Sequence, residues 1–440
     1  MRRWLLGLML SGGILTGTFC SQLIAALPQD AGQTATAQAA NKDDRSQDED
    51  KAEAAEEPSL YDNVVEQLST RYVDEDFREN KLPELVERYR PLAEAAETLE
   101  EAREATHALL RNIPATHLGL FSRTSYDRLM GELRNRSGPC LGFEVLDLDG
   151  KFYVHNLLEG GPAEQAGLRR GDRVVSVDGV LTEDSPRLDW RTDDAFLADA
   201  PITVLMCEEG ETLQLEIERT WGNMETVEVT AAEYSTWEAA KASAKVIEHE
   251  GTRLGYIHFW LIHLNGIPEL LKNKLEGDFA DCDALVLDLR GRGGAAHVIQ
   301  PMLEILSGES SDWDKPVVAL IDNESRSAKE VISFRLREEN IARLVGERTA
   351  GAVIPATFQD VGHDTILMFP TFRLGRFTDE IEGIGVPPDV YVARPGPYSG
   401  GKDPILEAGK VEALRMIAEE AATSAAGESK SGEAAVGAGR

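Results

Sequence analysis

Two uninterrupted apolar runs constrain the fold of this chain more than any other feature. The run "ALVLDL" covers residues 284–289, and the run "VVALI" covers residues 317–321. A strand that shows one face to water alternates polar and apolar residues, whereas a strand covered on both faces is apolar throughout. Segments with helical spacing lie between and after these runs. The second half of the chain is therefore predicted to be an α/β core built on a parallel sheet.

Each apolar run leads into a loop whose residue types suit ligand binding or catalysis. The first loop, "DLRGRGGAA" at 288–296, is rich in glycines, which let backbone N–H groups face a common point. The second, "DNESRSAKE" at 322–330, holds Ser325 and Ser327 before a predicted helix. The carboxyl ends of parallel strands are where α/β sheets bind ligands. A serine there is either a helix N-cap or a nucleophile that needs a base and oxyanion donors.

Composition narrows the classes of partner. The chain has 440 residues, 42% of them apolar, which is enough for several packed domains. Lys and Arg total 45 against 77 Asp and Glu, a net charge of −32 that repels phosphate backbones and anionic membranes. Nucleic acid is excluded as a predicted partner. No metal, nucleotide or other cofactor is predicted, because Cys140, Cys207 and Cys282 form neither a disulfide framework nor a zinc pattern.

The N-terminus has the build of a secretory signal. Residues 1–26 carry two arginines, a short apolar stretch and small residues, and residues 27–57 form an acidic segment that lacks the apolar content needed to fold. We expect an exported protein, periplasmic or secreted. An uncleaved N-terminus that tethers the chain to the membrane is the alternative.

The rest of the chain divides into segments that differ in their pattern of apolar, polar and glycine residues. Residues 58–136 have helical periodicity, 137–222 alternate short strands with glycine turns, 223–402 form the α/β core, 403–422 a last helix and 423–440 a disordered tail. The stretch "GPAEQAGLRRGDRVVSVDG" at 161–179 resembles a PDZ domain of the bacterial, circularly permuted kind, and "CLGF" at 140–143 resembles its carboxylate-binding loop. The resemblance implies that Leu141, Gly142 and Phe143 capture a peptide C-terminus. An unrelated small β domain is the alternative.

A wider resemblance follows from the order of the motifs. The PDZ-like segment, "LGYIHFWLI", "LVLDLRGRGG", "VVALIDNESRSAKE", "ARLVGERTAGAV" and "IEGIGVPPDVYV" together resemble the tail-specific, C-terminal-processing serine peptidases and the related tricorn protease. The resemblance implies that Ser327 is the nucleophile and that Ser325 caps the helix. It also implies an oxyanion hole built from backbone N–H groups of Gly293, Gly294 and Ala328.

The sequence departs from the processing proteases at the catalytic base. Their lysine position is occupied here by Ala352, and Lys329 is expected to point to another face, so that Lys329→Ala should retain activity. The tricorn-like branch uses a hydroxyl residue followed by histidine, which Thr116 and His117 match. Imidazole suits a base that works near neutral pH. A matching glutamate, Glu382, either orients the histidine's partner hydroxyl or is a solvated turn carboxylate.

The predicted fold class is multidomain α+β, with an N-terminal helical cap, a permuted bacterial-type PDZ domain and a ClpP/crotonase-like peptidase core. The predicted function is a serine endopeptidase that cleaves polypeptides, with the PDZ domain recognising C-terminal tails; self-association remains open. A catalytically inactive peptide-binding protein is the rival interpretation, motivated by the missing lysine. Esterase or amidase activity on a non-protein acyl substrate is a third.

Overall fold

A computed structural model describes residues 59–136, 138–190 and 202–437. The predicted signal and acidic segment, residues 1–57, lie outside the described residues. The described chain begins with helices whose apolar spacing buries one face, as in Leu60, Val64 and Leu68 of the first helix. The helices are α1 (Leu60–Arg71), α2 (Glu75–Asn80), α3 (Leu82–Glu94), α4 (Leu99–Leu110) and α5 (Arg123–Leu133). A capping box formed by Thr98 and Glu101 starts α4.

A small antiparallel sheet joins these helices to a distant part of the chain. Its strand order is β1-β18-β17, with β1 at Gly119–Ser122, β17 at Ala356–Asp360 and β18 at Thr365–Pro370. Leu367 and Phe369 of β18 share an apolar cluster with α1, α3 and α4. The sequence analysis assigned residues 356–370 to the peptidase core, and the structure packs them with the N-terminal helices instead. The sequence pattern gives no sign of which distant segment such strands would pair with.

The PDZ-like segment folds as a mainly antiparallel sheet with strand order β10-β9-β5-β4-β3-β8-β7 and with β6 beside β5. The strands are β3 (Phe143–Leu148), β4 (Lys151–Leu157), β5 (Arg173–Val177), β6 (Val180–Leu181), β7 (Leu188–Trp190), β8 (Ile202–Leu205), β9 (Thr212–Thr220) and β10 (Asn223–Thr230). The short helix α6 (Pro162–Gln165) and a 3-10 turn at Thr182–Asp184 complete it. A separate strand pair, β2 (Gly138–Cys140) with β11 (Ala232–Tyr234), lies where this part adjoins its neighbours in sequence.

The core sheet has the order β12-β13-β14-β15-β16-β19, and every neighbouring pair except β12–β13 is parallel. Its strands are β12 (Lys245–His249), β13 (Thr252–His258), β14 (Ala284–Asp288), β15 (Val317–Ile321), β16 (Arg343–Gly346) and β19 (Val390–Tyr391). The helices are α7 (Thr236–Ser243), α8 (Gly266–Glu276), a 3-10 turn at Ala296–Val298, α9 (Ile299–Leu306), α10 (Ala328–Glu338), α11 (Arg376–Ile381) and α12 (Pro404–Gly437).

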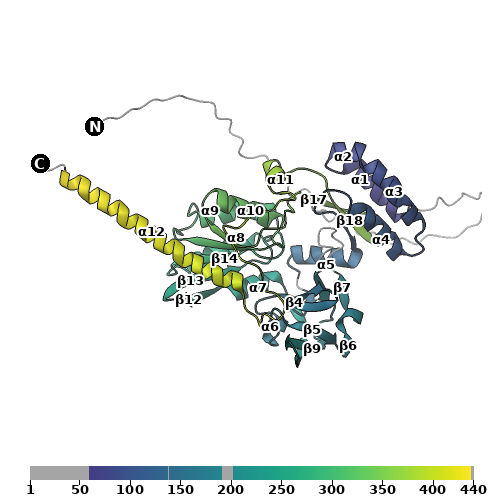
Figure 1. Ribbon diagram of the computed structural model, residues 1–440, viewed down its shortest axis with the longest axis horizontal. Helices are drawn as coiled ribbons and strands as arrows, with labels where there is room; N and C mark the ends of the chain where they lie inside the picture. The colour runs from purple at the N-terminus through teal and green to yellow at the C-terminus, as the bar shows by residue number, and fades with distance from the viewer. Residues whose placement is uncertain (1–58, 137, 191–201, 438–440) are drawn as a thin grey trace, which may run out of the picture. The chain divides into compact units, whose positions relative to one another are not determined.

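Both faces of the core sheet are covered, which explains the two apolar runs. In β14, Leu285 and Leu287 belong to the cluster formed with α8, α9 and α10, while Val286 belongs to the opposite cluster formed with α12. Successive side chains of a strand point to opposite faces, so both sets must be apolar. Figure 1 shows α12 running across the β13–β14 region and continuing past the sheet. The parallel, buried pairing of β14 with β15 confirms the predicted α/β core.

The last helix is longer than the sequence analysis predicted. Residues 423–437, assigned there to a disordered tail, continue α12 as far as Gly437. After Pro404 at its start this segment contains no proline, and it is rich in Ala and Glu, which favour helix. Among the described residues, no helix is both long enough and apolar enough to cross a membrane.

Candidate active site

The serine at the start of α10 adopts an unusual backbone conformation. Ser327 follows β15 and has φ +57° and ψ −124°, a left-handed region that a residue with a Cβ rarely occupies. Its N–H group donates to the Ala352 carbonyl at 2.8 Å and to the Glu330 carboxylate at 3.3 Å. Strain of this kind persists only where neighbours enforce it, and it is concentrated at functional sites. The half-buried Ser327 therefore lies on a strained turn that these two hydrogen bonds hold in place.

The second serine of the motif has a different role from the one expected. Ser325 is fully buried, and its hydroxyl donates to the Leu289 carbonyl at 2.8 Å and the Asp322 carboxylate at 3.0 Å. The prediction that Ser325 caps α10 is wrong, because the N-cap residue is Ser327. Ser325 instead ties the Ser327 turn to the start of the glycine-rich loop.

The glycine-rich loop lies directly against the strained serine. A Cβ on Gly293 would sit 3.1 Å from the Cβ of Ser327 and 3.0 Å from the Arg326 carbonyl. A Cβ on Gly294 would sit 2.2 Å from the Ile262 carbonyl. Position 294 therefore requires glycine, and a side chain at 293 would force its neighbours to shift by a few tenths of an ångström. Within the described residues, no hydrogen bond uses the N–H of Gly293, Gly294 or Ala328, so the three predicted oxyanion donors border Ser327 without an internal acceptor.

Thr116 and Glu382, which are 266 residues apart in sequence, are hydrogen-bonded to each other. The Thr116 hydroxyl donates to Glu382 Oε1 at 2.5 Å, and the Thr116 N–H donates to the same oxygen at 3.1 Å. Glu382 ends α11, while Thr116 lies between α4 and β1. The other oxygen, Oε2, accepts the N–H groups of Val353 and Ile354, each at 2.9 Å. Glu382 is thus no solvated turn carboxylate, because it accepts four hydrogen bonds.

A short chain of contacts connects this pair to the serine. Val353, held by Glu382, follows Ala352, whose carbonyl accepts the Ser327 N–H. Thr116 is therefore linked to Ser327 through three hydrogen bonds and the Ala352–Val353 peptide unit. His117 follows Thr116, is half-buried and has φ +51°, so its backbone also lies in the left-handed region. The structure thus brings segments 116–117, 327–328, 352–354 and 382 together.

Comparison with known proteins finds two domain families in this chain. Residues 300–392 match peptidase family S41, and residues 153–191 match the PDZ domain. The chain is 26% identical over 313 residues to a carboxyl-terminal-processing protease of Picosynechococcus, which covers 64% of this chain and 70% of that protein. Residues 300–392 thus carry a peptidase S41 match and residues 153–191 a PDZ match, and together with the processing-protease relatives they indicate a serine peptidase.

Tricorn-type proteins align over a longer part of this chain. It is 24% identical over 380 residues to the tricorn protease of Thermoplasma acidophilum, covering 79% of this chain and 34% of that protein. The chain spans about a third of the length of its tricorn-type relatives. A solved photosystem II D1 C-terminal processing protease covers 76% of this chain at 20% identity with a TM-score of 0.49.

The lysine position of the processing proteases is occupied here by Ala352, and the nearby Lys329 has other partners. Ala352 is buried at this position. Lys329 is fully buried, and its Nζ donates to the carbonyls of Trp260 at 3.0 Å and Arg290 at 2.8 Å. Burial lowers the pKa of Lys329 to about 7. The amine thus binds two main-chain carbonyls, one of them at Arg290 in the glycine-rich loop.

Sequence reasoning missed one carboxylate that organises the turn. Glu330 is fully buried and accepts from Thr349 Oγ1 at 2.6 Å, Gly351 N at 2.6 Å and Ala352 N at 2.7 Å, besides Ser327 N. It joins α10 to the segment that faces the serine. The S-x-x-E spacing of Ser327 and Glu330, which is the pattern of a capping box, was the available signal.

The predicted peptide-binding loop is tightly held. The carbonyl of buried Leu141 accepts from Ala163 N at 2.9 Å, and that of Gly142 accepts from Leu158 N at 2.9 Å. Phe143 begins β3. A peptide added to β3 would need its free edge. That edge is taken in part by β8, which pairs with β3 at Val145 and Leu146.

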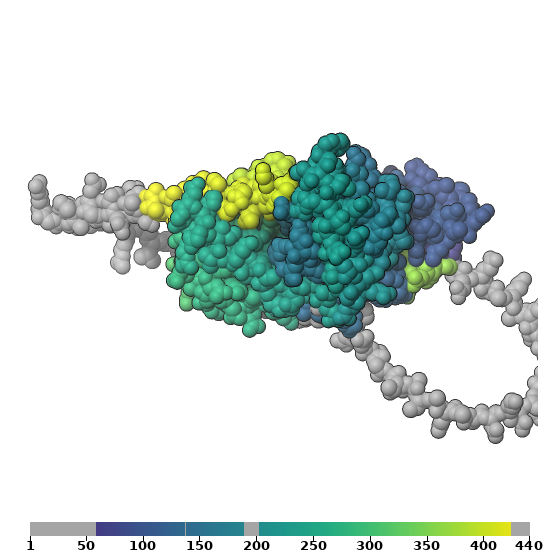
Figure 2. Space-filling model, turned by 90° about the horizontal axis from the view of Figure 1, so that it is seen from below, coloured from purple at the N-terminus to yellow at the C-terminus, as the bar shows by residue number. Residues whose placement is uncertain are grey.

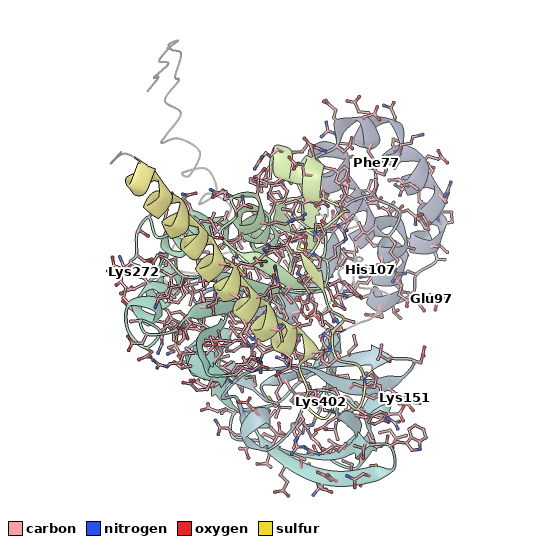
Figure 3. The ribbon with its side chains drawn as sticks, turned by 60° about the vertical axis from the view of Figure 1, so that its left-hand side comes forward. Phe77, Glu97, His107, Lys151, Lys272 and Lys402 are labelled. Atoms are coloured by element: carbon pink, nitrogen blue, oxygen red, sulfur yellow. The ribbon has the colours of Figure 1, made fainter. Side chains whose placement is uncertain are left out.

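Three of the other histidines have structural partners. His258 contacts Glu159 at 2.9 Å, His263 contacts the Glu132 carbonyl at 3.0 Å and His155 pairs with Glu324. Figure 3 shows His107 among the N-terminal helices, and His297 is exposed. The described residues hold no cluster of His, Cys, Asp or Glu that could bind a metal ion.

Proposed function

We propose that this S41 peptidase is an endopeptidase that uses Ser327 as nucleophile and His117 as base. In this mechanism the Ser327 hydroxyl attacks the scissile carbonyl while its proton passes to the His117 imidazole. The imidazolium then protonates the leaving amine, and the C–N bond breaks. Water, deprotonated by His117, attacks the acyl-enzyme, and the proton returns to Ser327 as the acid product leaves. The observation that carries the proposal is the contact chain from Thr116 through Glu382 and Val353 to the strained Ser327.

The other site residues have defined roles in this proposal. The N–H groups of Gly293 or Gly294 and of Ala328 hold the oxyanion that forms on attack. Glu382 accepts the Thr116 hydroxyl and so fixes the backbone that carries His117. Thr116 and Glu382 act on the orientation of the base and not on the substrate.

We further propose that the protein is exported and that polypeptide C-termini are its substrates. The PDZ loop at Leu141, Gly142 and Phe143 would hold the terminal carboxylate. Because β8 occupies part of the β3 edge, this mode requires β8 to shift or the peptide to bind beside Phe143 only. The relatives named as C-terminal processing proteases support this substrate class.

A non-catalytic peptide-binding role is the second candidate, favoured by Ala352 at the lysine position. A fluorophosphonate probe distinguishes the two, because it labels an activated serine. The expected result is labelling of Ser327 in the full chain and none in Ser327→Ala. Absence of labelling, together with intact folding, would favour the binding role.

The decisive test of the enzyme is fragment analysis of an unfolded protein by mass spectrometry. We expect cleavage by the parent chain and none by Ser327→Ala or His117→Ala. Full cleavage by Ser327→Ala would refute the proposal. Faster turnover of esters than of any peptide would point to the acyl-ester alternative instead.

A further inference from the structure

A buried polar chain crosses from the PDZ-type sheet to both loops of the active site. Its first part centres on Arg292, which directly precedes the oxyanion candidate Gly293. The Arg292 guanidinium bonds to Glu132 of α5 at 2.5 Å and to Glu144 of β3. Glu144 directly follows the predicted carboxylate loop at Phe143. Through the Glu144–Arg292 pair, the PDZ-type sheet thus contacts the glycine-rich loop next to its proposed oxyanion donor.

The second part centres on Glu324, three residues before the nucleophile. Its carboxylate pairs with His155 of β4 and with Arg394, the latter at 2.9 Å. Burial alone would raise the pKa of Glu324, but His155 and Arg394 hold it well below its usual range. Glu324 is therefore an anion at neutral pH, bound between the PDZ-type sheet and the core.

One side chain joins the two parts. The amide nitrogen of Asn156, on β4, donates to Glu144 Oε2 at 2.8 Å and to Glu324 Oε2 at 3.0 Å. The exposed fractions are 6% for Glu144, 8% for Asn156 and 9% for Glu324. Asn156 thus separates two buried carboxylates and satisfies both. Figure 2 shows the teal residues of the PDZ-type sheet next to the green residues of the core on this face.

We infer that Asn156 and Glu144 are positioning residues for catalysis, and that the PDZ domain is therefore a fixed part of the active-site scaffold. The inference rests on the proposed function. Each residue acts through another group: Glu144 through Arg292 on the loop of Gly293, and Asn156 through Glu324 on the turn of Ser327. The two loops must keep a common spacing for the serine and the oxyanion donors to meet one carbonyl.

The chemistry of the network makes it sensitive to single changes. Removing a donor from a buried carboxylate oxygen leaves that oxygen without its hydrogen bond, which costs more than losing an exposed pair. In Asn156→Ala the Glu144 and Glu324 carboxylates lose their shared donor and face each other. The local response open to the protein is to move the loops apart.

The test compares Asn156→Ala and Glu144→Gln with the parent in the full chain. The substrate is a short, unstructured peptide cleaved by the parent and amidated at its C-terminus, so that PDZ capture of a carboxylate plays no part. We expect kcat to fall at least tenfold in both variants while KM changes less than twofold. Values of kcat within twofold of the parent would overturn the inference.

Tyr398→Phe is the matched control. Tyr398 donates to Glu218 of β9 at 2.6 Å, so it also links the PDZ-type sheet to the later part of the chain, but it touches neither catalytic loop. We expect its kcat to stay within twofold of the parent. An equal loss of kcat in Tyr398→Phe would show a general need for interface stability and would refute a positioning role.

Amide hydrogen exchange separates this inference from the proposed function. In Asn156→Ala we expect faster exchange at Gly293, Gly294 and Ser327 than in the parent, with unchanged exchange in the core strand β14. Unchanged exchange at all of these amides would overturn the inference even if the parent proved inactive. An inactive, unlabelled parent with faster exchange in the variant would refute the proposed function alone.

Discussion

At the scale of single residues, backbone conformation distinguishes the two serines of the motif. Ser325 has a buried hydroxyl with two acceptors, whereas Ser327 is half-buried on a left-handed turn. The strain at Ser327 costs on the order of 1–3 kcal/mol and is paid back by the bonds of its N–H group. On this turn Ser327 lies against Gly293 of the glycine-rich loop.

Replacing Ser327 tests the strain directly. Ser327→Ala and Ser327→Gly should both abolish peptidase activity, but they should differ in stability. Glycine accepts φ +57° without strain, and its extra freedom in the unfolded chain offsets only part of that gain. We expect Ser327→Gly to unfold at higher urea concentration than Ser327→Ala, with a free energy of unfolding about 1 kcal/mol larger. Equal urea midpoints would contradict a strained turn.

The buried lysine predicts a pH effect on stability. In the folded chain Lys329 has a pKa of about 7 because of burial, only partly offset by Asp322 and Asp288, against 10.5 as its ordinary value. Below pH 7 the folded and the unfolded chain both hold the Lys329 proton, so the buried charge destabilises the folded chain to its full extent. Between pH 7 and 10.5 only the unfolded chain holds it, and the free energy of unfolding rises with pH.

Lys329→Met should remove this rise. Between pH 7 and pH 9 we expect the parent to gain roughly 2 kcal/mol more than the variant, measured by urea unfolding at both pH values. Methionine preserves the volume that Lys329→Ala would leave empty, so it also tests the expectation that a lysine base is not needed. A variant with the same pH slope as the parent would show that Lys329 keeps its proton when folded.

At the scale of elements, the first turn of α10 acts as an anchor. Glu330 receives four donors, three of them from the segment 349–352 that faces the serine. Burial raises the pKa of Glu330, while these hydrogen bonds oppose the rise. The helix start and the facing segment are thereby fixed as one unit.

Glu330→Gln should loosen that unit. A glutamine amide presents N–H groups to backbone donors, so at least two bonds are lost and the free energy of unfolding should fall by about 2 kcal/mol or more. The control is Glu338→Gln at the other end of α10, where an exposed pair with Arg376 is worth about 0–1 kcal/mol. Urea unfolding of both variants gives the comparison, and equal losses would argue against the anchor.

At the scale of the whole molecule, the site is assembled from three distant parts of the chain. The sheet β1-β18-β17 fastens the N-terminal helices to a hairpin that follows Ile354. It thereby brings Thr116 to Glu382 and to the serine turn. The catalytic base proposed above thus depends on a strand pairing between residues about 250 positions apart.

Thr116→Val should weaken catalysis more than stability. Valine keeps the shape but loses the bond to Glu382, so the backbone of His117 is less well fixed. We expect at least a tenfold fall in kcat with KM within twofold, measured on the same peptide. Thr106→Val, which loses a hydroxyl bond within α4, should leave kcat unchanged; an equal loss there would remove the special role of Thr116.

The sequence by itself determined the local and periodic features of this protein. The apolar runs predicted a doubly covered sheet, the glycines predicted a close loop, and the order of motifs predicted a C-terminal-processing or tricorn-like serine peptidase with a PDZ domain. These signals are local, because they depend on residues near one another in the chain. The predictions for α12 beyond residue 422 and for the role of Ser325 were wrong. Both depended on helix propensity or on the choice of N-cap residue, and the alternatives there differ by small free energies.

Only the tertiary structure decided which distant groups meet. The bond of Thr116 to Glu382, the burial of Lys329 under two carbonyls and the chain from Arg292 through Asn156 to Glu324 join residues far apart in sequence. No period or motif encodes such contacts, because they follow from how separate elements pack and which buried polar groups must find partners. The physical reason is that burial, and not sequence proximity, fixes the partner of each polar group.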